Sequence, residues 1–386
     1  MTLNVPTPEH MTDGDLTIFR DSVVHFLDRH APPARIEQWR HDKVVARALW
    51  TRAGEASLLG LSTDADHGGA GGDFRHEVVL MEEVARRGLD GWGVTLHNAI
   101  VMPYISHYGT AEQKARWLPQ LASGARVGAI AMTEPGAGSD LQGVRTTARR
   151  RGEGYVLNGS KTFITNGQTA ELVIVVAKTD PSRGAKGISL FVVETEAATG
   201  FERGRNLDKI GLEAADTSEL FFNDVALPAT ALLGGEEGRG FVQLMEQLPQ
   251  ERLIIAVQAM AMIERALAVT LDYVRQRHAF GRPVIDNQVV AFRLAECKTE
   301  ATVAKVFVNH CVGQHLAGRL DAATASMAKY WVTELQGRII DTCLQLHGGY
   351  GYMDEYPIAR MFKDARVARI YGGTNEIMKL LIARTL

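Results

Sequence analysis

The spacing of apolar residues changes twice along the chain and divides it into three blocks. In residues 1–125, apolar side chains recur every three or four positions. TDGDLTIFRDSVVHFLDRH begins with a capping-type Thr-Asp pair and places Leu16, Phe19, Val23 and Phe26 on one helical face. RHEVVLMEEVARRG and TAEQKARWLPQLASG repeat this amphipathic pattern. The first block is therefore predicted to be an α-helical domain.

Residues 126–237 have a strand-like pattern. ELVIVVAKTD, GISLFVVETE and TSELFFNDVALP are β-prone runs separated by turn residues. YVLNGSKTFITNG carries Asn158-Gly159 between two such runs, which predicts a hairpin turn. Because no helical pattern of useful length intervenes, we expect an antiparallel β domain rather than βαβ units.

Residues 238–386 return to a helical pattern. ERLIIAVQAMAMIERALAVTLDYVRQR begins apolar nearly all round, which is typical of a helix buried on every side. NQVVAFRLAECKTEATVAKVFVNHCVGQHL and DAATASMAKYWVTELQGRIIDTCLQLHGG predict two further long helices. Long helices packed side by side predict a four-helix bundle. The expected fold class is α+β and multidomain: a helical domain, a β domain and a helical bundle.

Composition and charge exclude several function classes. A chain of 386 residues is long enough for two or three domains with a large core. Its net charge is −3, and Arg149–Arg151 is an isolated basic cluster, so nucleic-acid binding is not expected. The first residues, MTLNVPTPEHMTDGD, have no secretory pattern, and apolar runs such as LVIVVA are too short for a bilayer. We expect a soluble, cytoplasmic protein without membrane insertion.

The cysteines and histidines give no indication of a metal site. Cys297, Cys311 and Cys343 are odd in number, widely spaced and without a C-x-x-C pair, which favours reduced, buried thiols. His347 has no second ligand at a useful spacing. Neither a structural disulfide nor a metal ion is expected.

MTEPGAGSD, from Met132 to Asp140, leaves a predicted strand and enters a glycine-rich turn. Its glycines would let backbone N–H groups approach a ligand closely. The alternative is an ordinary tight loop between strands, which an isolated G-x-G more often forms. The segment lacks the third glycine, the βαβ unit and the acidic residue of a dinucleotide fingerprint, and the chain has no Walker A motif.

Four segments together resemble the acyl-CoA dehydrogenase family. They are MTEPGAGSD, NGSKTFITNG, RQRHAFGRPVIDNQ and LQLHGGYGYMDEYPIARMFKDARVARIYGGTNEI, in the family's order. QLPQERL, TASMAKYW and YGGTNEIMK are most similar to the long-chain branch. The resemblance implies that a base takes the α-proton of an acyl-CoA while the β-hydride passes to N5 of FAD, giving a trans-2-enoyl-CoA. It also implies an electron-transferring flavoprotein as acceptor, and a homotetramer in which dimers share their FAD sites.

The resemblance assigns cofactor contacts residue by residue. Thr133 and Ser139 match residues beside the flavin, Ser139 also reaching the CoA portion; Phe163 matches an aromatic against the isoalloxazine, and Thr165 a neighbouring hydrogen-bond partner. Arg277, Phe280 and Gln288 match residues that reach the FAD of a neighbouring subunit, and an arginine suits a pyrophosphate. Without the resemblance, Phe163 would be a core aromatic and Arg277 a helix C-terminal cation. The full set of cofactor residues is Met132, Thr133, Ser139, Phe163, Ile164, Thr165, Arg277, Phe280, Gln288, Gln345, Leu346, His347, Gly348, Gly349, Thr374, Asn375 and Glu376.

Substrate contacts follow from the same resemblance. The predicted set is Ser139, Arg203, Gly204, Pro249, Gln250, Arg252, Gly372 and Gly373. A surface salt bridge is an alternative role for Arg252. Residues 90–102 match the helix at the floor of the acyl pocket, where Gly91 and Gly93 indicate either a deeper pocket or a looser helix start.

The catalytic base has two candidates, because many family members carry a glutamate where this chain has Gly372. Glu376 would lie in the first turn of the last helix, capped by Thr374, where an acid stabilises the helix dipole without further duty. Glu251 precedes a thick apolar run, with Pro249 suited to a helix start or kink. Burial there would raise its pKa, and a helix N-terminus would oppose the rise.

From the residues alone, Glu251 as a base and Glu251 as a first-turn acid are evenly matched. In the long-chain and isovaleryl branches the base comes from this helix, with glycine at the Gly372 position. The resemblance therefore identifies Glu251 as the base and assigns the Gly372 backbone N–H to the thioester carbonyl.

Other functions remain open at this point. A flavin-dependent monooxygenase on the same fold needs no α-proton base, and a scaffold protein would lose its flavin contacts. Within the dehydrogenases, the substrate could be medium- to long-chain, branched, or bound to a carrier protein.

Overall fold

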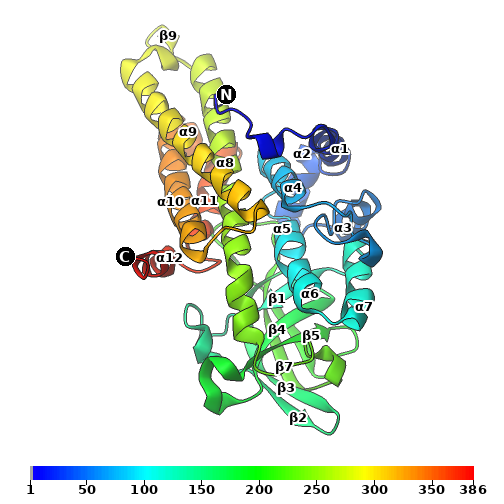
Figure 1. Ribbon diagram of the computed structural model, residues 1–386. Coiled ribbons are helices and arrows are strands. Elements are labelled where there is room, and N and C mark those ends of the chain that lie inside the picture. Colours follow the sequence, from blue (N-terminus) through cyan, green and yellow to red (C-terminus); the bar gives the residue numbers. More distant parts are fainter. Residues whose placement is uncertain (1–2) are drawn as a thin grey trace.

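A computed structural model describes residues 3–386 and has the three predicted domains (Figure 1). The N-terminal helices lie beside the upper part of the molecule, the sheet forms its lower end, and the long C-terminal helices extend away from the sheet. The predicted order of helical domain, β domain and helical bundle is confirmed.

The N-terminal domain consists of short amphipathic helices. They are α1 Gly14–His30, α2 Pro33–Asp42, α3 Arg47–Glu55, α4 Phe74–Arg87, α5 Val94–Leu96, a π-helical segment His97–Val101, α6 Met102–Tyr108 and α7 Ala111–Ala122. Asp13 caps α1 through the N–H of Asp15, and Thr110 with Gln113 forms a capping box on α7. The predicted face of α1 is buried at Leu16, Val23 and Phe26, and Phe19 is partly buried against it.

The middle domain is a seven-stranded sheet in which β1, β4, β2, β3, β7 and β6 are successive neighbours and β5 pairs with β4. The strands are β1 Gly128–Ala131, β2 Thr147–Arg151, β3 Gly154–Thr165, β4 Leu172–Lys178, β5 Ile188–Glu194, β6 Phe201–Asn206 and β7 Thr217–Leu227. The prediction of a purely antiparallel sheet is wrong, since β4 lies parallel to β1 and β2. The chain returns to β4 through the β2–β3 hairpin, so these parallel neighbours need no crossover helix.

The predicted hairpin turn at Asn158-Gly159 is also wrong. The turn lies at Gly152, whose φ of +59° suits a tight β2–β3 connection. Asn158 and Gly159 instead lie within β3, where the register against β7 shifts at a bulge. The Asn158 side chain spans this bulge, accepting from the Asp224 N–H and donating to its carboxylate at 2.9 Å each.

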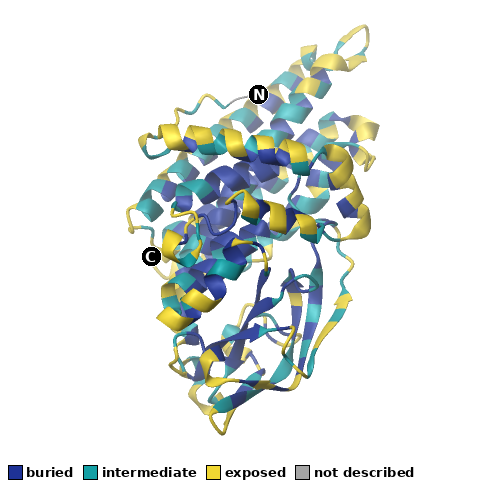
Figure 2. Cartoon of the chain, turned by 90° about the vertical axis from the view of Figure 1, so that its right-hand side faces the viewer, coloured by how far each residue is buried: buried dark blue, intermediate teal, exposed yellow. Residues whose placement is uncertain are grey.

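The C-terminal domain is built on α8, Gly240–Gln276, which runs the length of the bundle (Figure 1). Its partners are α9 Gln288–Leu316, α10 Ala322–Leu346, α11 Pro357–Ala365 and α12 Asn375–Ala383, with the short hairpin β8 His278–Ala279 and β9 Arg282–Pro283 at the far end. α8 packs against α4, α9, α10 and α11. It is long and apolar enough to cross a membrane, but most of its apolar stretch is buried inside the protein. Figure 2 shows that buried residues gather in the interior of the helical part and of the sheet.

The core consists of three apolar clusters. One is shared by the N-terminal helices and the C-terminal bundle, one lies between α6–α7 and the sheet, and the third is on the sheet and its covering loops. Because the first cluster crosses the domain boundary, the helical domains pack as one body around α8.

The contact of Gly93 with Asn166 joins the first two domains. A Cβ on Gly93 would lie 1.9 Å from the Asn166 Oδ1, and Asn166 donates to the carbonyls of Gly93 and Gly128 at 3.2 and 3.1 Å. Gly91 meets Ala214 in the same way, at 2.8 Å. Gly91 and Gly93 allow the β domain to pack closely against the N-terminal domain. Neither a deeper pocket nor a looser helix start is needed to explain these two glycines.

We predict that Gly93→Ala lowers the thermal unfolding midpoint, because the added methyl must displace Asn166, an overpacking cost of about 1–3 kcal/mol. The double variant Gly93→Ala/Asn166→Gly should lose less than the sum of the single losses, since both changes act at one contact. Gly14→Ala is the matched control, with no atom within 4 Å of its Cβ. Additive losses would contradict the proposed contact.

Candidate functional site

Glu251 lies in the interior of α8 rather than at its start. The helix begins at Gly240, about three turns earlier, so the sequence-based expectations of a first-turn acid and of a helix start at Pro249 are wrong. The apolar helix tolerates Pro249 within it and extends back towards the sheet, which the sequence pattern did not reveal. The helix N-terminus is therefore too far away to hold the carboxylate ionised.

The Glu251 carboxyl is buried and has one hydroxyl partner. Tyr104, on α6, donates to Oε1 at 2.8 Å. Burial raises the pKa of Glu251 to about 7, while the Tyr104 hydrogen bond and the charge of Arg252 act in the opposite direction. A carboxyl with this pKa is partly ionised at neutral pH, as a general base requires. Tyr104 was not identified from the sequence.

Gly372 lies against the same face of α8. A Cβ at this position would be 2.4 Å from Cδ1 of Ile255, one turn after Glu251. The φ of Gly372 is +63°, which disfavours any other residue. Within residues 3–386 its N–H donates to no protein acceptor. The structure therefore places Gly372, whose N–H is free within residues 3–386, beside Ile255, one turn of α8 after the buried carboxyl of Glu251.

The segment that carries Gly372 is anchored to α10. The buried Lys329 ammonium donates to the Gly373 carbonyl at 2.7 Å and to Oδ1 of Asn375 at 3.0 Å. Asn375 is itself buried and donates to Oε1 of Glu334 at 2.8 Å. Thr374 caps α12, as predicted. The Asn375 side chain is thus structural, leaving only backbone from Thr374 to Asn375 for a ligand.

Glu376 does not compete as a base. Its side chain is exposed in the first turn of α12, and hydrogen bonding to the backbone there and to Thr374 lowers its pKa. An exposed carboxylate with a lowered pKa is a weak proton acceptor. This agrees with the structural role expected for it.

The neighbours of Glu251 on α8 are also engaged. Gln250 donates to the Ala99 carbonyl at 2.9 Å, and Pro249 is partly buried. Arg252 is buried with only the Ser326 hydroxyl at 3.5 Å, and its Nε has no partner in residues 3–386. A buried guanidinium without a carboxylate is suited to contact a ligand, as the prediction for Arg252 requires.

The glycine-rich turn MTEPGAGSD is held beside β3 by a buried ion pair. The Lys161 ammonium donates to Oε1 of Glu134 at 2.9 Å and to the Met132 carbonyl at 3.0 Å. Burial lowers the pKa of Lys161 to about 8. Glu134 also accepts from two backbone N–H groups, of Arg145 and Thr146. Neither member of this pair was identified from the sequence.

The ion pair places the predicted flavin residues together. The Thr162 N–H donates to the Thr133 carbonyl at 2.9 Å, so Thr133 lies beside the segment that carries Phe163. Phe163 sits at a β3 bulge with a φ of +59°, and 68% of its surface is exposed. Such a conformation is costly for an aromatic residue and persists where function requires it. Ile164 is buried in the sheet core, Thr165 is partly buried, and Ser139 is exposed in the turn.

Arg203 and Gly204 have structural explanations that differ from the prediction. The Arg203 guanidinium donates to the carbonyls of Gly167 and Ala170 and to the Thr195 hydroxyl. A Cβ on Gly204 would lie 2.9 Å from that of Glu219 on the neighbouring strand. A sequence pattern cannot show such an engagement, and these contacts do not favour a free phosphate-binding arginine.

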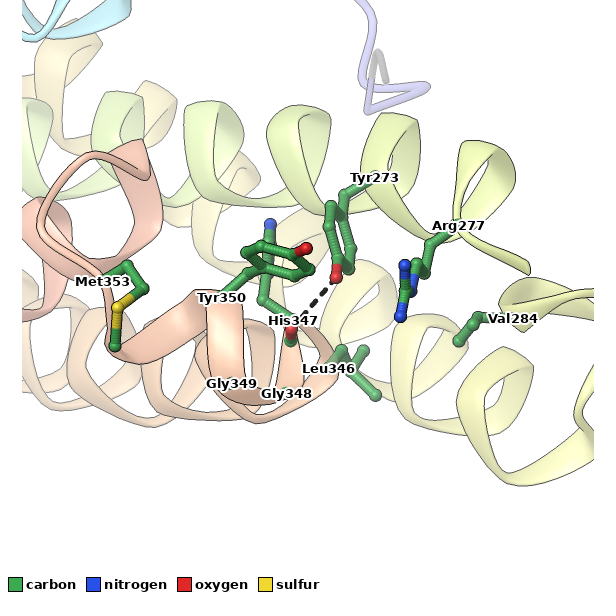
Figure 3. Close-up of a pocket in the computed structure, with 9 residues that line it drawn as sticks. All are labelled: Tyr273, Arg277, Val284, Leu346, His347, Gly348, Gly349, Tyr350 and Met353. Carbon is green, nitrogen blue, oxygen red and sulfur yellow. Dashed lines mark hydrogen bonds between the residues drawn. The ribbon is translucent and has the colours of Figure 1, made fainter. Parts of the chain in front are cut away.

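A second region lies at the far end of α8. Arg277, Leu346, His347, Gly348 and Gly349 line one pocket of about 550 Å³ together with Tyr273, Val284, Tyr350 and Met353 (Figure 3). The structure thus brings together Arg277 and the QLHGG segment, which lie far apart in the sequence. Gln345, Gln288 and Phe280 are outside this lining but exposed nearby along the chain, Phe280 by 96% at the β8–β9 turn.

The aromatic residues of this pocket were not predicted. Tyr273 stacks on His347 with ring centroids 4.3 Å apart and donates to the His347 carbonyl at 3.1 Å. The His347 ring contacts the Cys343 carbonyl through Nδ1 at 2.8 Å, which explains the buried imidazole without a metal. Arg277 lies 5.7 Å from the Tyr350 ring centre, as a cation–π pair.

Comparisons with known proteins agree with this arrangement. Family models described as the N-terminal, middle and C-terminal domains of acyl-CoA dehydrogenase match residues 14–125, 129–225 and 238–386. The mitochondrial long-chain specific acyl-CoA dehydrogenase of Rattus norvegicus is 52% identical over 394 residues, covering 100% of this chain and 91% of that protein.

Solved structures are similar over the whole fold. An acyl-CoA dehydrogenase from Geobacillus kaustophilus matches with a TM-score of 0.94 and 47% identity, over 100% of this chain and 99% of that one. A glutaryl-CoA dehydrogenase from Mycobacterium smegmatis in complex with FADH2 matches with a TM-score of 0.90 and 30% identity, over 98% and 95%.

The pKa of Glu251 predicts a pH-dependent stability difference. The folded carboxyl keeps its proton up to about pH 7, while an unfolded glutamate loses it near 4.5. Folding therefore binds a proton between these values, and this contribution to stability is lost as pH rises through that range. A glutamine at position 251 does not titrate, so Glu251→Gln does not lose this stability as pH rises. The variant should therefore be more stable than the wild type at pH 8, by roughly 3 kcal/mol at most.

Thermal unfolding at pH 5 and pH 8 measures this difference. The gain of Glu251→Gln over the wild type should be clearly larger at pH 8. Glu246→Gln, an exposed position on the same helix, should show no such change between the two pH values. An equal gain at both pH values would show that the carboxyl is not buried with a raised pKa.

Proposed function

The chain belongs to the acyl-CoA dehydrogenase family and is an oxidoreductase of that kind, and from this premise we propose its reaction, base and substrate. It desaturates a saturated acyl-CoA thioester, medium- to long-chain, between Cα and Cβ to give the trans-2-enoyl-CoA. Glu251 is the base and Gly372 polarises the thioester. FAD is the cofactor.

One observation carries the proposal: Gly372, whose N–H has no acceptor within residues 3–386, lies against Ile255 of α8, one turn after the buried Glu251 carboxyl. The Glu251 side chain reaches the interior between α6 and α8, and Gly372 covers Ile255, one turn further. A carboxyl with a pKa near 7 and an unpaired N–H donor are the two groups that enolate formation from a thioester requires.

The chain's residues account for the proton step. Glu251 takes a proton from Cα, and the electron pair of that C–H bond becomes the Cα–Cβ double bond as hydride leaves Cβ. The Gly372 N–H donates to the thioester oxygen, where negative charge develops as the proton leaves. Burial of Glu251 removes water that would compete for it and raises the proton affinity of its carboxylate, so that the carboxylate accepts the α-proton and becomes the neutral acid. Bound FAD supplies the hydride acceptor, at flavin N5.

The residues present fit FAD. Phe163 and Thr133 present a strained, exposed aromatic ring beside a glycine-rich turn, and Thr165 follows on the same strand. Arg277 and the Leu346–Gly349 segment offer a guanidinium and unobstructed backbone around one pocket, as a pyrophosphate and adenosine require. No other cofactor is needed for the proposed chemistry.

We infer that two copies of the chain together form one complete FAD site. Glu251 and Arg277 lie about 39 Å apart along α8, at 1.5 Å per residue, which exceeds the reach of one FAD. We infer that the catalytic end of α8 and the adenosine-binding residues of one chain serve different FAD molecules. The exposed apolar residues Val289, Phe292, Val303 and Val306 share one face of α9 and offer a surface for a second copy. This supports the proposed dimer of dimers.

The electron acceptor is proposed from the family resemblance, and the compartment from the sequence pattern alone. We propose an electron-transferring flavoprotein as the partner that reoxidises the flavin, and a cytoplasmic location. The long-chain relative supports a long acyl group, and branched or carrier-bound thioesters are the alternatives that a substrate screen would separate.

We predict that the purified yellow protein bleaches anaerobically when a saturated acyl-CoA is added, fastest with medium or long chains. The flavin absorbance near 450 nm, followed for straight, branched and carrier-bound acyl thioesters from about C4 to C20, ranks the substrates. The matched control is an acyl-CoA thioether without the carbonyl oxygen. Its α-hydrogens are not acidic, so it should bind without bleaching.

If no thioester bleaches the flavin, the dehydrogenase proposal is wrong. Flavin that is reduced only by an external reductant and then consumes O₂ with a second substrate would indicate the monooxygenase alternative. Protein that binds no FAD would indicate a scaffold.

We also predict that two inactive variants restore activity in mixed oligomers. Arg277→Ala removes a contact at the adenosine end, and Glu251→Gln removes the base. In a mixed dimer, one site combines the intact Glu251 of one chain with the intact Arg277 of the other. Co-expression with two different affinity tags, followed by tandem purification, should give up to about half of the wild-type turnover per dimer. Activity equal to the average of the two separate variants would contradict the shared site.

A further inference from the structure

The hydroxyl of Tyr104 is the one polar group of α6 that reaches the Glu251 carboxyl. The side chain is fully buried, and within residues 3–386 its only hydrogen bond is the 2.8 Å donation to Oε1 of Glu251. The ring packs near Tyr108, with centroids 6.2 Å apart. A phenylalanine would fill the same apolar space, so the hydroxyl has no packing role of its own.

The backbone before Tyr104 is shaped to hold this contact. The π-helical segment His97–Val101 immediately precedes α6, and Gln250 donates to the Ala99 carbonyl within it at 2.9 Å. Gln250 and Glu251 are consecutive, so two adjacent residues of α8 bond to the π-helical segment and to Tyr104 on α6, respectively. A π-turn is a frequent local adjustment at functional sites. Here it sets Tyr104 in register with the carboxyl.

His97 fixes the other side of the π-helical segment. Its Nδ1 accepts from the Gly128 N–H at 3.0 Å, and its Nε2 donates to the Leu121 carbonyl at 3.1 Å. Burial lowers the pKa of His97 to about 4, so the ring remains neutral and keeps this pattern of one donor and one acceptor. The segment is therefore bonded both to the β domain and to α8.

The groups that face Glu251 are few. They are Tyr104 and Tyr108 from α6 and Arg252 from α8, and Lys329 from α10 faces Arg252. The Tyr108 hydroxyl is engaged elsewhere, donating to the Glu246 carboxylate at 2.8 Å. Tyr104 remains a proton donor in the hydrogen bond at every working pH, because burial holds its pKa well above its usual value.

We propose that Tyr104 is a positioning residue for the base: its hydroxyl holds Oε1 of Glu251 and favours the ionised carboxylate, leaving Oε2 to take the α-proton. This inference rests on the proposed function. A hydrogen bond donated to a carboxylate is stronger than one donated to a neutral carboxylic acid, so it offsets part of the cost of burying the charge. The same bond restricts the side chain to one rotamer and so directs the second oxygen.

The test is the pH dependence of kcat/KM for Tyr104→Phe, with the FAD-loaded full-length enzyme and the best acyl-CoA of the screen. Without the donor the Glu251 carboxylate is less stable, so the acid limb should move to higher pH by about one unit. Turnover at pH 7 should fall about fivefold, because the ionised fraction of Glu251 drops from about a half to about a tenth, and much of this loss should be recovered by about pH 9. FAD content, and the thermal midpoint at pH 5, where the Glu251 carboxyl of both proteins is protonated, should stay close to those of the wild type.

Tyr108→Phe is the matched control, because it removes a hydroxyl from the same helix that bonds an exposed carboxylate instead. Its pH profile should coincide with that of the wild type. A Tyr104→Phe profile that is lowered equally at every pH, or unchanged, would overturn the positioning role. If the wild type and Tyr108→Phe do not turn over any acyl-CoA, the proposed function fails instead, so the two failures are distinguishable.

Discussion

The structure depends on one constraint: the carboxyl of Glu251, in the middle of α8, is buried in the apolar environment between α6 and α8. Removing Glu251 from water is unfavourable for its charge, which is why its pKa rises to about 7. The same desolvation makes the group a useful base near neutral pH. Its surroundings limit the cost, since Tyr104 donates to the carboxyl and Gln250 binds the adjacent π-helical segment. The burial of Glu251, its raised pKa and the contacts that position its side chain therefore depend on one another.

The loop opposite α8 is consistent with this constraint. A side chain at Gly372 would collide with Ile255 and would require an unfavourable φ, so a glutamate cannot be accommodated there without further changes. Lys329 and Asn375 hold the loop in place through buried hydrogen bonds to α10. These contacts are consistent with the proposed roles, in which α8 supplies the Glu251 side chain and the Gly372 loop supplies a backbone N–H.

Much of the fold could be predicted because apolar periodicity reports burial. The long helices α9 and α10 and the amphipathic α1 follow from spacing alone. The predictions were wrong where tertiary contacts overrode the preference of a short sequence motif. Asn158-Gly159 forms a bulge instead of a turn, and Pro249 lies within α8. The resemblance predicts Glu251 and Gly372 as site residues, and the structure buries the first and places the second beside α8. Tyr104, Lys161 and Lys329 were not predicted, because a buried polar residue has no signature in sequence. Their roles depend on contacts between segments far apart in the chain.

Two buried glutamates have pKa values raised to about 7 by burial, Glu251 and Glu77, and only Glu251 faces α6 and the Gly372 loop. The rate of flavin reduction in a single anaerobic turnover, compared between Glu251→Gln and Glu77→Gln, tests the assignment of the base most directly. The account predicts a loss of about two to four orders of magnitude for Glu251→Gln and a rate within a few-fold of wild type for Glu77→Gln. Near wild-type reduction by FAD-loaded Glu251→Gln would contradict it.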